Sequence, residues 1–166
     1  MLLEKLRERF GAEILQAQEA HGAHWVTVSR DRAAELLKTL RDELDFAFDM
    51  LTDLTAVDWL ERTPRFDVVY HLNSLKLRHR LSVKVPVDMA DLWVNSVIGI
   101  WKAADWLERE CYDMFGIEFR GHGDLRRILL YDSFQGHPLR KDYPYQQRQP
   151  IVPETNAVVA PLPPSR

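Results

Sequence analysis

The stretch AADWLERECYDMFGIEFRGHGDLRRILLYDSFQGHPLRKDYP, residues 103–144, carries the strongest patterns in this chain. Its first third predicts a helix, because apolar side chains recur at helical spacing at Leu107, Cys111 and Met114. Gly116 follows directly, and glycine is a typical residue at the end of a helix. We therefore expect an amphipathic helix whose apolar stripe faces a core.

The charges of this stretch change sign along the chain. Residues 103–118 contain five acids and one base, whereas residues 119–148 contain six bases and three acids. Within the helix, Asp105, Arg109 and Asp113 are spaced four apart, so the arginine can pair with a carboxylate one turn away. An acidic helix thus leads into a basic segment, which is an obvious internal partner for its acids.

The whole chain has the size and composition of one globular domain. With 166 residues it can bury roughly 70% of its unfolded surface. A net charge of −3 argues against a general nucleic-acid binder. The single cysteine, Cys111, allows no intramolecular disulfide and no four-thiolate iron-sulfur cluster, and its place on the apolar stripe predicts a small buried residue. The longest apolar run is far shorter than the ~20 residues of a spanning helix, so we expect no membrane span.

Hydrophobic periodicity predicts an α+β fold with a largely antiparallel sheet and helices packed on one face. The expected helices cover residues 2–10, 31–44 and 103–115, and the expected strands cover residues 14–20, 24–29, 49–58, 65–72 and 77–85. Seven of the nine prolines lie beyond residue 131, and such density stops helices and breaks sheet ladders. We therefore predict an α+β domain over residues 1–130 and an extended C-terminal arm over residues 131–166, which docks on neighbouring subunits.

Few residues form a pattern typical of catalysis. The histidines and Cys111 lack the paired spacing of a zinc site, and no complete dinucleotide or P-loop fingerprint occurs. Glu108 and Glu110 point about 200° apart on a helix, so they cannot flank one substrate atom. Glu110 and Asp113 are expected to share a face, and a small independent enzyme built around these two acids therefore stays open as an alternative.

The order of residues after Trp101 resembles a known signature, that of the C-type subunit (the 30 kDa-type subunit) of bacterial respiratory NADH:quinone oxidoreductase, complex I. The resemblance is strong over residues 101–144 and weaker over residues 46–59. The positions that carry it are Glu108, Arg109, Glu110, Asp113, His122, Arg126, Arg127, His137, Arg140, Lys141, Asp142, Tyr143 and Pro144.

The resemblance implies a cofactor-free structural subunit in the hydrophilic arm of a proton-pumping enzyme that passes electrons from NADH through iron-sulfur clusters to quinone. It implies that the iron-sulfur clusters and FMN reside in partner subunits, and that the chain packs against the quinone-site neighbour, a subunit of D type. It further implies a peripheral position on the cytoplasmic side of the bacterial inner membrane. The signature residues are then expected at interfaces or in packing, with no catalytic, cofactor-binding or metal-binding role.

Relatives of the same family provide the main alternative. Equivalent subunits occur in ferredoxin-driven, deazaflavin-driven and hydrogenase-type membrane complexes, in which other chains determine the electron donor. The form GHPLRKDYP at residues 136–144 favours the NADH and quinone branch.

Overall fold

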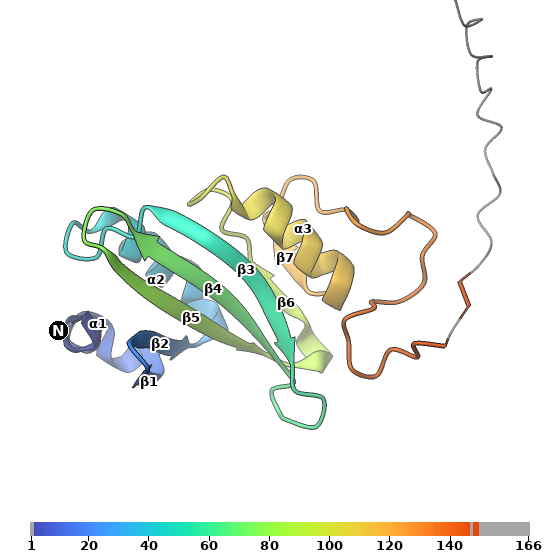
Figure 1. The fold of residues 1–166 in the computed structure, drawn as a ribbon, viewed down its shortest axis with the longest axis horizontal. Coiled ribbons are helices and arrows are strands. Elements are labelled where there is room, and N and C mark those ends of the chain that lie inside the picture. The colour runs from blue at the N-terminus through green and yellow to red at the C-terminus, as the bar shows by residue number, and fades with distance from the viewer. Residues whose placement is uncertain (1, 147, 150–166) are drawn as a thin grey trace, which may run out of the picture.

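A five-stranded sheet forms the centre of the computed structural model, which describes residues 2–146, 148 and 149 (Figure 1). Its spatial order is β1-β2-β5-β4-β3. Every neighbouring pair is antiparallel except β2 and β5, which are parallel. The strands are β1 (Ile14–Ala20), β2 (Ala23–Val28), β3 (Met50–Asp58), β4 (Phe66–Ser74) and β5 (His79–Val87).

Alternation along β4 and β5 gives the sheet a buried side. Tyr70 pairs with Val83 in the register, and Val68 pairs with Val85. All four side chains are buried at 1% exposure or less. Side chains two residues apart lie on the same face of a strand, so these buried residues form one continuous layer.

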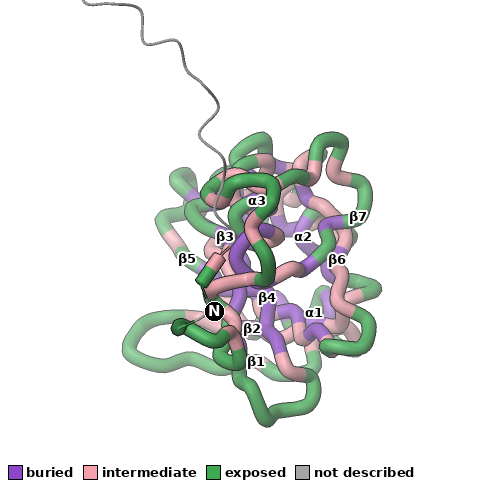
Figure 2. Tube along the Cα trace, turned by 90° about the vertical axis from the view of Figure 1, so that its right-hand side faces the viewer, coloured by how far each residue is buried: buried purple, intermediate pink, exposed green. Residues whose placement is uncertain are grey.

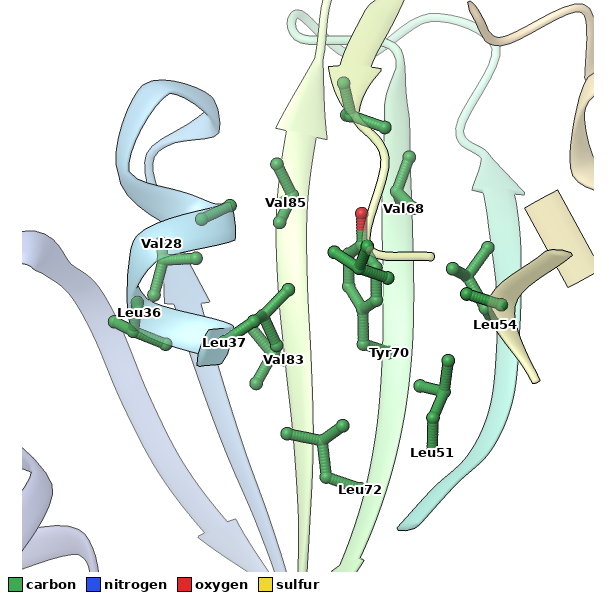
Figure 3. Packing of buried hydrophobic residues seen from close by; sticks show 14 of the residues in the cluster. Val28, Leu36, Leu37, Leu51, Leu54, Val68, Tyr70, Leu72, Val83 and Val85 are labelled. Atoms are coloured by element: carbon green, nitrogen blue, oxygen red, sulfur yellow. The ribbon is translucent and has the colours of Figure 1, made fainter. Parts of the chain in front are cut away.

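The helices cover that layer. These are α1 (Leu2–Phe10), α2 (Arg30–Asp42) and α3 (Ala104–Phe115), and short 3-10 turns follow at Gly11–Glu13 and Met89–Asp91. Leu36 and Leu37 of α2 pack against the strand residues, as Figure 3 shows, and the same buried cluster includes Cys111 of α3. In Figure 1, α2 lies behind β4 and β5, and no helix crosses in front of these strands. The predicted fold class, α+β with helices on one face of a largely antiparallel sheet, is confirmed.

Two short strands were not predicted. β6 (Trp93–Asn95) and β7 (Glu118–Arg120) pair in parallel as a separate two-stranded sheet beside α3. Each has three residues, which is too short for a periodic pattern to be detected. Their pairing brings the segment before α3 next to the segment after it.

The second helix is shorter than predicted. It ends at Asp42 instead of residue 44, and Leu44 is 77% exposed. Phe46 and Phe48, which follow the helix, are buried at 2% and 0%. The aromatic residues therefore fill the core position that the helical stripe assigned to Leu44.

Beyond β7, the described residues contain no helix or strand. This part of the chain is mostly exposed, while the buried segments lie in the sheet and in the helices that cover it (Figure 2). Residues 150–166 of the predicted arm lie outside the described residues. No described helix is long and apolar enough to cross a membrane.

Candidate functional site

Asp113, near the end of α3, is the centre of the best-connected polar group in the signature region. Its side chain is fully buried. Nη1 of Arg127 donates to Oδ1 at 2.7 Å. The consecutive backbone N–H groups of Ile128, Leu129 and Leu130 donate to Oδ2 at 3.0, 2.8 and 2.9 Å. One carboxylate thus fixes the path of the chain for four residues.

These donors keep Asp113 ionised. Burial alone would raise its pKa, but the three N–H groups and the Arg127 guanidinium outweigh burial and lower it. The predicted pairing of Arg109 with a carboxylate one turn away is wrong. Arg109 instead donates to the carbonyl oxygens of Arg126 and Arg127, each at 3.2 Å. α3 therefore holds the segment after it through two residues, Asp113, which accepts from Arg127, and Arg109, which donates to backbone carbonyl oxygens.

The same segment caps the C-terminus of α3. The last carbonyls of a helix lack intrahelical partners. Here Nδ1 of His137 donates to the carbonyl oxygen of Asp113 at 2.9 Å. The backbone N–H of Leu139 donates to the carbonyl oxygen of Met114 at 3.2 Å. Nε of Arg140 donates to the carbonyl oxygen of Phe115 at 2.5 Å. A cation at this end also complements the negative pole of the helix dipole.

Gly116 makes this close approach possible. Its φ is +75°, in the left-handed region that glycine adopts readily. A Cβ at this position would lie 2.5 Å from both Nε2 of His137 and Nη2 of Arg140. Burial lowers the pKa of His137. The neutral imidazole therefore donates from Nδ1, and Nε2 carries the lone pair.

A second ionic cluster connects this segment to the sheet. Arg65, at the start of β4, donates to both oxygens of Asp58 at 2.8 and 2.7 Å and to both oxygens of Asp142 at 3.0 and 2.7 Å. The backbone N–H of Lys141 donates to Asp58 at 2.8 Å. Asp58 is buried, and its pKa is lowered well below the usual range mainly by Arg65.

Glu108 lies on the core side of α3. It is fully buried and accepts from the hydroxyl of Ser96 and the backbone N–H of Val97, each at 2.6 Å. Burial raises its pKa. Glu110, in contrast, is exposed and has no polar partner among the described residues. Glu110 and Asp113 lie three residues apart on α3, yet their surroundings differ, because the C-terminal segment covers Asp113 and leaves Glu110 exposed.

His122 occupies the other end of the helix. Its Nδ1 accepts from the backbone N–H of Asp124 at 3.0 Å, so Nε2 carries the proton. That Nε2 lies 3.2 Å from Oδ1 of Asp105. This pair holds the turn after β7 against the first turn of α3.

The other signature residues lie at the surface of the same segment. Arg126 is exposed and pairs with Asp124 at 3.0 Å. Tyr143 stacks on Phe134 with ring centroids 6.3 Å apart, while Lys141 and Pro144 are exposed. The structure thus brings Arg127, His137 and Arg140 to the end of α3, whereas Asp142 and the backbone of Lys141 bind residues beside the sheet. Large apolar side chains also lie exposed in this region, namely Trp106 (63%), Leu129 (62%), Tyr131 (40%), Leu139 (53%) and Tyr145 (88%).

Sequence reasoning missed several partners of the signature residues. Ser96 and Val97 carry no motif, and only their place in the fold brings them to Glu108. Asp58 lies within residues 46–59, where the resemblance is weak, and Arg65 lies outside it. An aspartate at the end of a predicted strand with an arginine just before the next strand is the signal that could have suggested the pair.

The two buried acids of α3 are bonded within the chain. Both oxygens of Asp113 and both of Glu108 are used as acceptors within the chain. Cys111 is a free thiol at 2% exposure, and burial raises its pKa far above the usual range. Among the described residues, no group of three or more His, Cys, Asp or Glu side chains is placed to hold a metal ion.

Comparisons with known proteins identify a family and several similar proteins. A profile of the 30 Kd subunit of respiratory-chain NADH dehydrogenase matches residues 26–149. The C-type subunit of NADH-quinone oxidoreductase from Citrifermentans bemidjiense is 51% identical over 142 residues, which are 86% of this chain and 87% of the relative. The C-type subunit from Geobacter sulfurreducens is 46% identical over 143 residues, with 86% and 87% covered.

Two solved structures are also similar. A trypsin-resistant fragment of Nqo5 superposes with a TM-score of 0.67 at 35% identity, covering 75% of this chain and all of the fragment. A chain of the membrane-bound sulfane sulfur reductase, an archaeal respiratory membrane complex, gives a TM-score of 0.73 at 24% identity, covering 87% and 85%. The second similarity supports the fold alone.

Proposed function

The chain belongs to the family of the 30 kDa subunit of respiratory-chain NADH dehydrogenase, and from this premise we propose that it is a cofactor-free structural subunit of the peripheral arm of NADH:quinone oxidoreductase. It supports electron transfer from NADH through iron-sulfur clusters to quinone without carrying electrons itself. The iron-sulfur clusters and FMN belong to partner subunits. The names of relatives that are 46–51% identical, C-type subunits of NADH-quinone oxidoreductase, favour this assembly over a ferredoxin, deazaflavin or hydrogenase type.

The observation that carries the proposal is the way in which the signature segment is held. Its Arg127 and Arg140 side chains point back into the domain, at Asp113 and at the carbonyl oxygen of Phe115. The backbone N–H of Lys141 donates to Asp58, and together these bonds fix the path of the segment. Leu129 and Leu139 remain exposed on the same segment, at 62% and 53%. A fixed loop that presents apolar side chains is typical of a surface that docks on another protein.

The partner that we propose for this surface is the quinone-site neighbour, a subunit of D type. We place the chain, as part of the complex, at the cytoplasmic side of the bacterial inner membrane. A single buried thiol also supports a cofactor-free role, because an iron-sulfur cluster is usually held by four thiolates. The alternative of a small enzyme using Glu110 and Asp113 is not favoured, since one acid is exposed and the other is fully occupied by donors.

Substitution of the exposed apolar residues tests the proposal. A tagged chain expressed in its own cell should co-purify with a membrane-bound assembly that has iron-sulfur absorbance and NADH:quinone activity. Leu129→Glu should reduce both the recovered assembly and its activity, while the melting temperature of the isolated chain stays unchanged. Leu75→Glu is the matched control, because Leu75 is 63% exposed in the turn between β4 and β5, far along the chain from the signature.

Either of two results would contradict the proposal. The tagged wild-type chain could emerge alone as a small soluble species. Alternatively, Leu129→Glu and Leu75→Glu could assemble equally well, which would remove the docking role of the signature segment.

A further inference from the structure

The five-stranded sheet has a second face that no described helix covers (Figure 1). Cross-strand pairs place side chains in two rows on this side, opposite to the buried layer. We call it the open face, and its rows are Gln18, Trp25, Ser82, His71 and Asp53, followed by Gln16, Thr27, Lys84, Val69 and Thr55. It runs across all five strands, so it is as wide as the sheet itself.

Trp25, on β2, lines two hollows of this face. The first hollow, of about 320 Å³, reaches toward Trp59 and Pro86. The second, of about 640 Å³, reaches toward His71 and Arg80. Both hollows are open to solvent along the sheet. Such a surface suits an extended segment or a helix that lies across the strands better than a small enclosed ligand.

Two cations of the open face lack a carboxylate partner within the described part of the chain. Elsewhere on the chain arginines bind carboxylates, as Arg65 and Arg127 do. Lys84 and Arg80 form no ion pair among the described residues. The oxygens of Asp67 are both occupied, by Nε1 of Trp59 at 2.8 Å and by Nη2 of Arg62 at 2.5 Å. Asp53, on the outer strand, is the one acid of the two rows, and it accepts from the backbone N–H of Leu54 at 2.9 Å. Lys84 is therefore a cation without a carboxylate partner among the described residues.

Lys84 is also held in position. Its Nζ lies 4.5 Å from the centroid of the Trp25 ring, and the ring of His71 meets Trp25 edge-on with centroids 6.0 Å apart. A cation over an aromatic face has lost side-chain freedom before any partner arrives, and its N–H groups stay available. A pre-organised cation beside an aromatic anchor is a favourable arrangement for binding a carboxylate next to an apolar side chain.

We propose that the open face is a second docking surface that binds an acidic segment of a neighbouring polypeptide. A carboxylate of this segment pairs with Lys84, and an apolar side chain beside it packs on Trp25. The proposal rests on the proposed function in so far as the segment belongs to another subunit of the same assembly. It concerns a surface on the opposite side of the sheet from the helices and uses none of the signature residues.

Zero-length cross-linking in the intact assembly tests this inference. A carbodiimide joins a lysine amine to a carboxylate only when the two are in ion-pair contact. In the complex purified through the tagged chain, mass spectrometry should find Lys84 joined to an Asp or Glu of another subunit. The cross-link should vanish in Lys84→Arg, which keeps the charge but lacks the amine. Lys84→Glu should lower the affinity for the assembly at least about fivefold, whereas Lys38→Glu on α2 should not change it.

Accessibility of an introduced thiol gives an independent measurement, because the natural Cys111 is buried. In Gln16→Cys, a maleimide should label the free chain rapidly and the assembled chain at least tenfold more slowly. An active assembly without a Lys84 cross-link, in which Gln16→Cys labels as fast as in the free chain, would overturn this inference and leave the proposed function intact. Binding of the isolated chain to phosphatidylglycerol vesicles that depends on Lys84 would also overturn it, in favour of a lipid surface. Failure of any assembly to co-purify would instead refute the proposed function itself.

Discussion

Replacement of Asp113 by asparagine is the sharpest test of how the signature segment is held. Asparagine has the same shape as aspartate, so packing is preserved, but it offers one acceptor oxygen and one NH₂ group. If its oxygen takes the place of Oδ2 and accepts from Ile128, Leu129 and Leu130, its NH₂ must face the guanidinium of Arg127. The change therefore places donor against donor and leaves a cation without its counter-charge.

The size of the effect follows from these contacts. Breaking a buried ion pair costs about 3–5 kcal/mol, because the remaining charge stays unpaired. The side chain of Arg127 is 16% exposed, so water recovers part of this cost. We expect Asp113→Asn to lower the free energy of unfolding by about 3 kcal/mol. For a domain of this size that corresponds to a fall in Tm of about 6–12 °C.

Thermal and urea unfolding of the isolated chain at pH 7, followed by circular dichroism, measures this loss. Glu110→Gln is the matched control, because Glu110 precedes Asp113 by three residues on the same helix, is exposed, and has no polar partner among the described residues. We expect the control to change stability by less than about 0.5 kcal/mol. A loss of the same small size for Asp113→Asn would refute the reasoning, since the carboxylate would then contribute nothing that an amide cannot.

The pH dependence gives a second readout of the same group. The pKa of Asp113 is lowered in the folded chain, so its stabilisation is fully present above the unfolded pKa of about 3.9 and is lost as pH falls through the folded value. Asparagine does not titrate. The difference between the wild type and Asp113→Asn should therefore be constant from pH 6 to 8 and should shrink below about pH 4.

Three further substitutions separate the other buried groups. Glu108→Gln should lower the free energy of unfolding by less than about 1 kcal/mol at pH 7. Burial raises the pKa of Glu108, so the stability that this group gives the wild type is present at low pH and is lost as pH rises through the folded pKa. In urea titrations the variant should therefore gain stability relative to the wild type between pH 4 and 8. Gly116→Ala should cost about 2 kcal/mol from its left-handed φ alone and should speed hydrogen exchange in residues 136–143. Asp58→Asn should lower the free energy of unfolding by about 2–3 kcal/mol, because Asp58 is buried. Asp142→Asn should lower it by at most about 1 kcal/mol in the same assay, because the side chain of Asp142 is 50% exposed. Equal losses in the two variants would contradict the role given to burial.

Local patterns were sufficient to predict most elements. The helix at Leu2–Phe10 has the predicted bounds, because its apolar spacing and the following Gly11 are local signals. The strand at Ile14–Ala20 also has the predicted bounds, and it ends before the turn at His21 and Gly22. The parallel pairing of β2 with β5 could not be predicted in this way. It joins strands more than fifty residues apart, and nothing in either strand specifies the direction of its distant neighbour.

The candidate site shows the same division between local and distant information. The burial of Glu108 was available from the pattern, since Glu108 lies one residue after Leu107 and three before Cys111, at the edge of the apolar stripe. The burial of Asp113 was not, because the side of the helix that carries it is covered by residues 126–140, which come later in the chain. Spacing alone favoured a pair between Arg109 and Asp113, yet the carboxylate binds a guanidinium 14 residues further along the chain.

Signature residues that bind groups of their own chain can be distinguished by experiment from residues that contact a partner. Glu108, Asp113 and Arg127 bind groups of their own chain, so replacing them should change the stability of the isolated protein. The side chain of Leu129 on the signature segment is exposed, and Lys84 on the open face forms no ion pair among the described residues. Replacing either side chain should therefore change the stability of the isolated protein little. Any loss of assembly in those two variants must then come from lost contacts with a partner. A survey of variants by unfolding and by co-purification therefore distinguishes residues that shape the subunit from residues that attach it, even where both are equally intolerant of change in the cell.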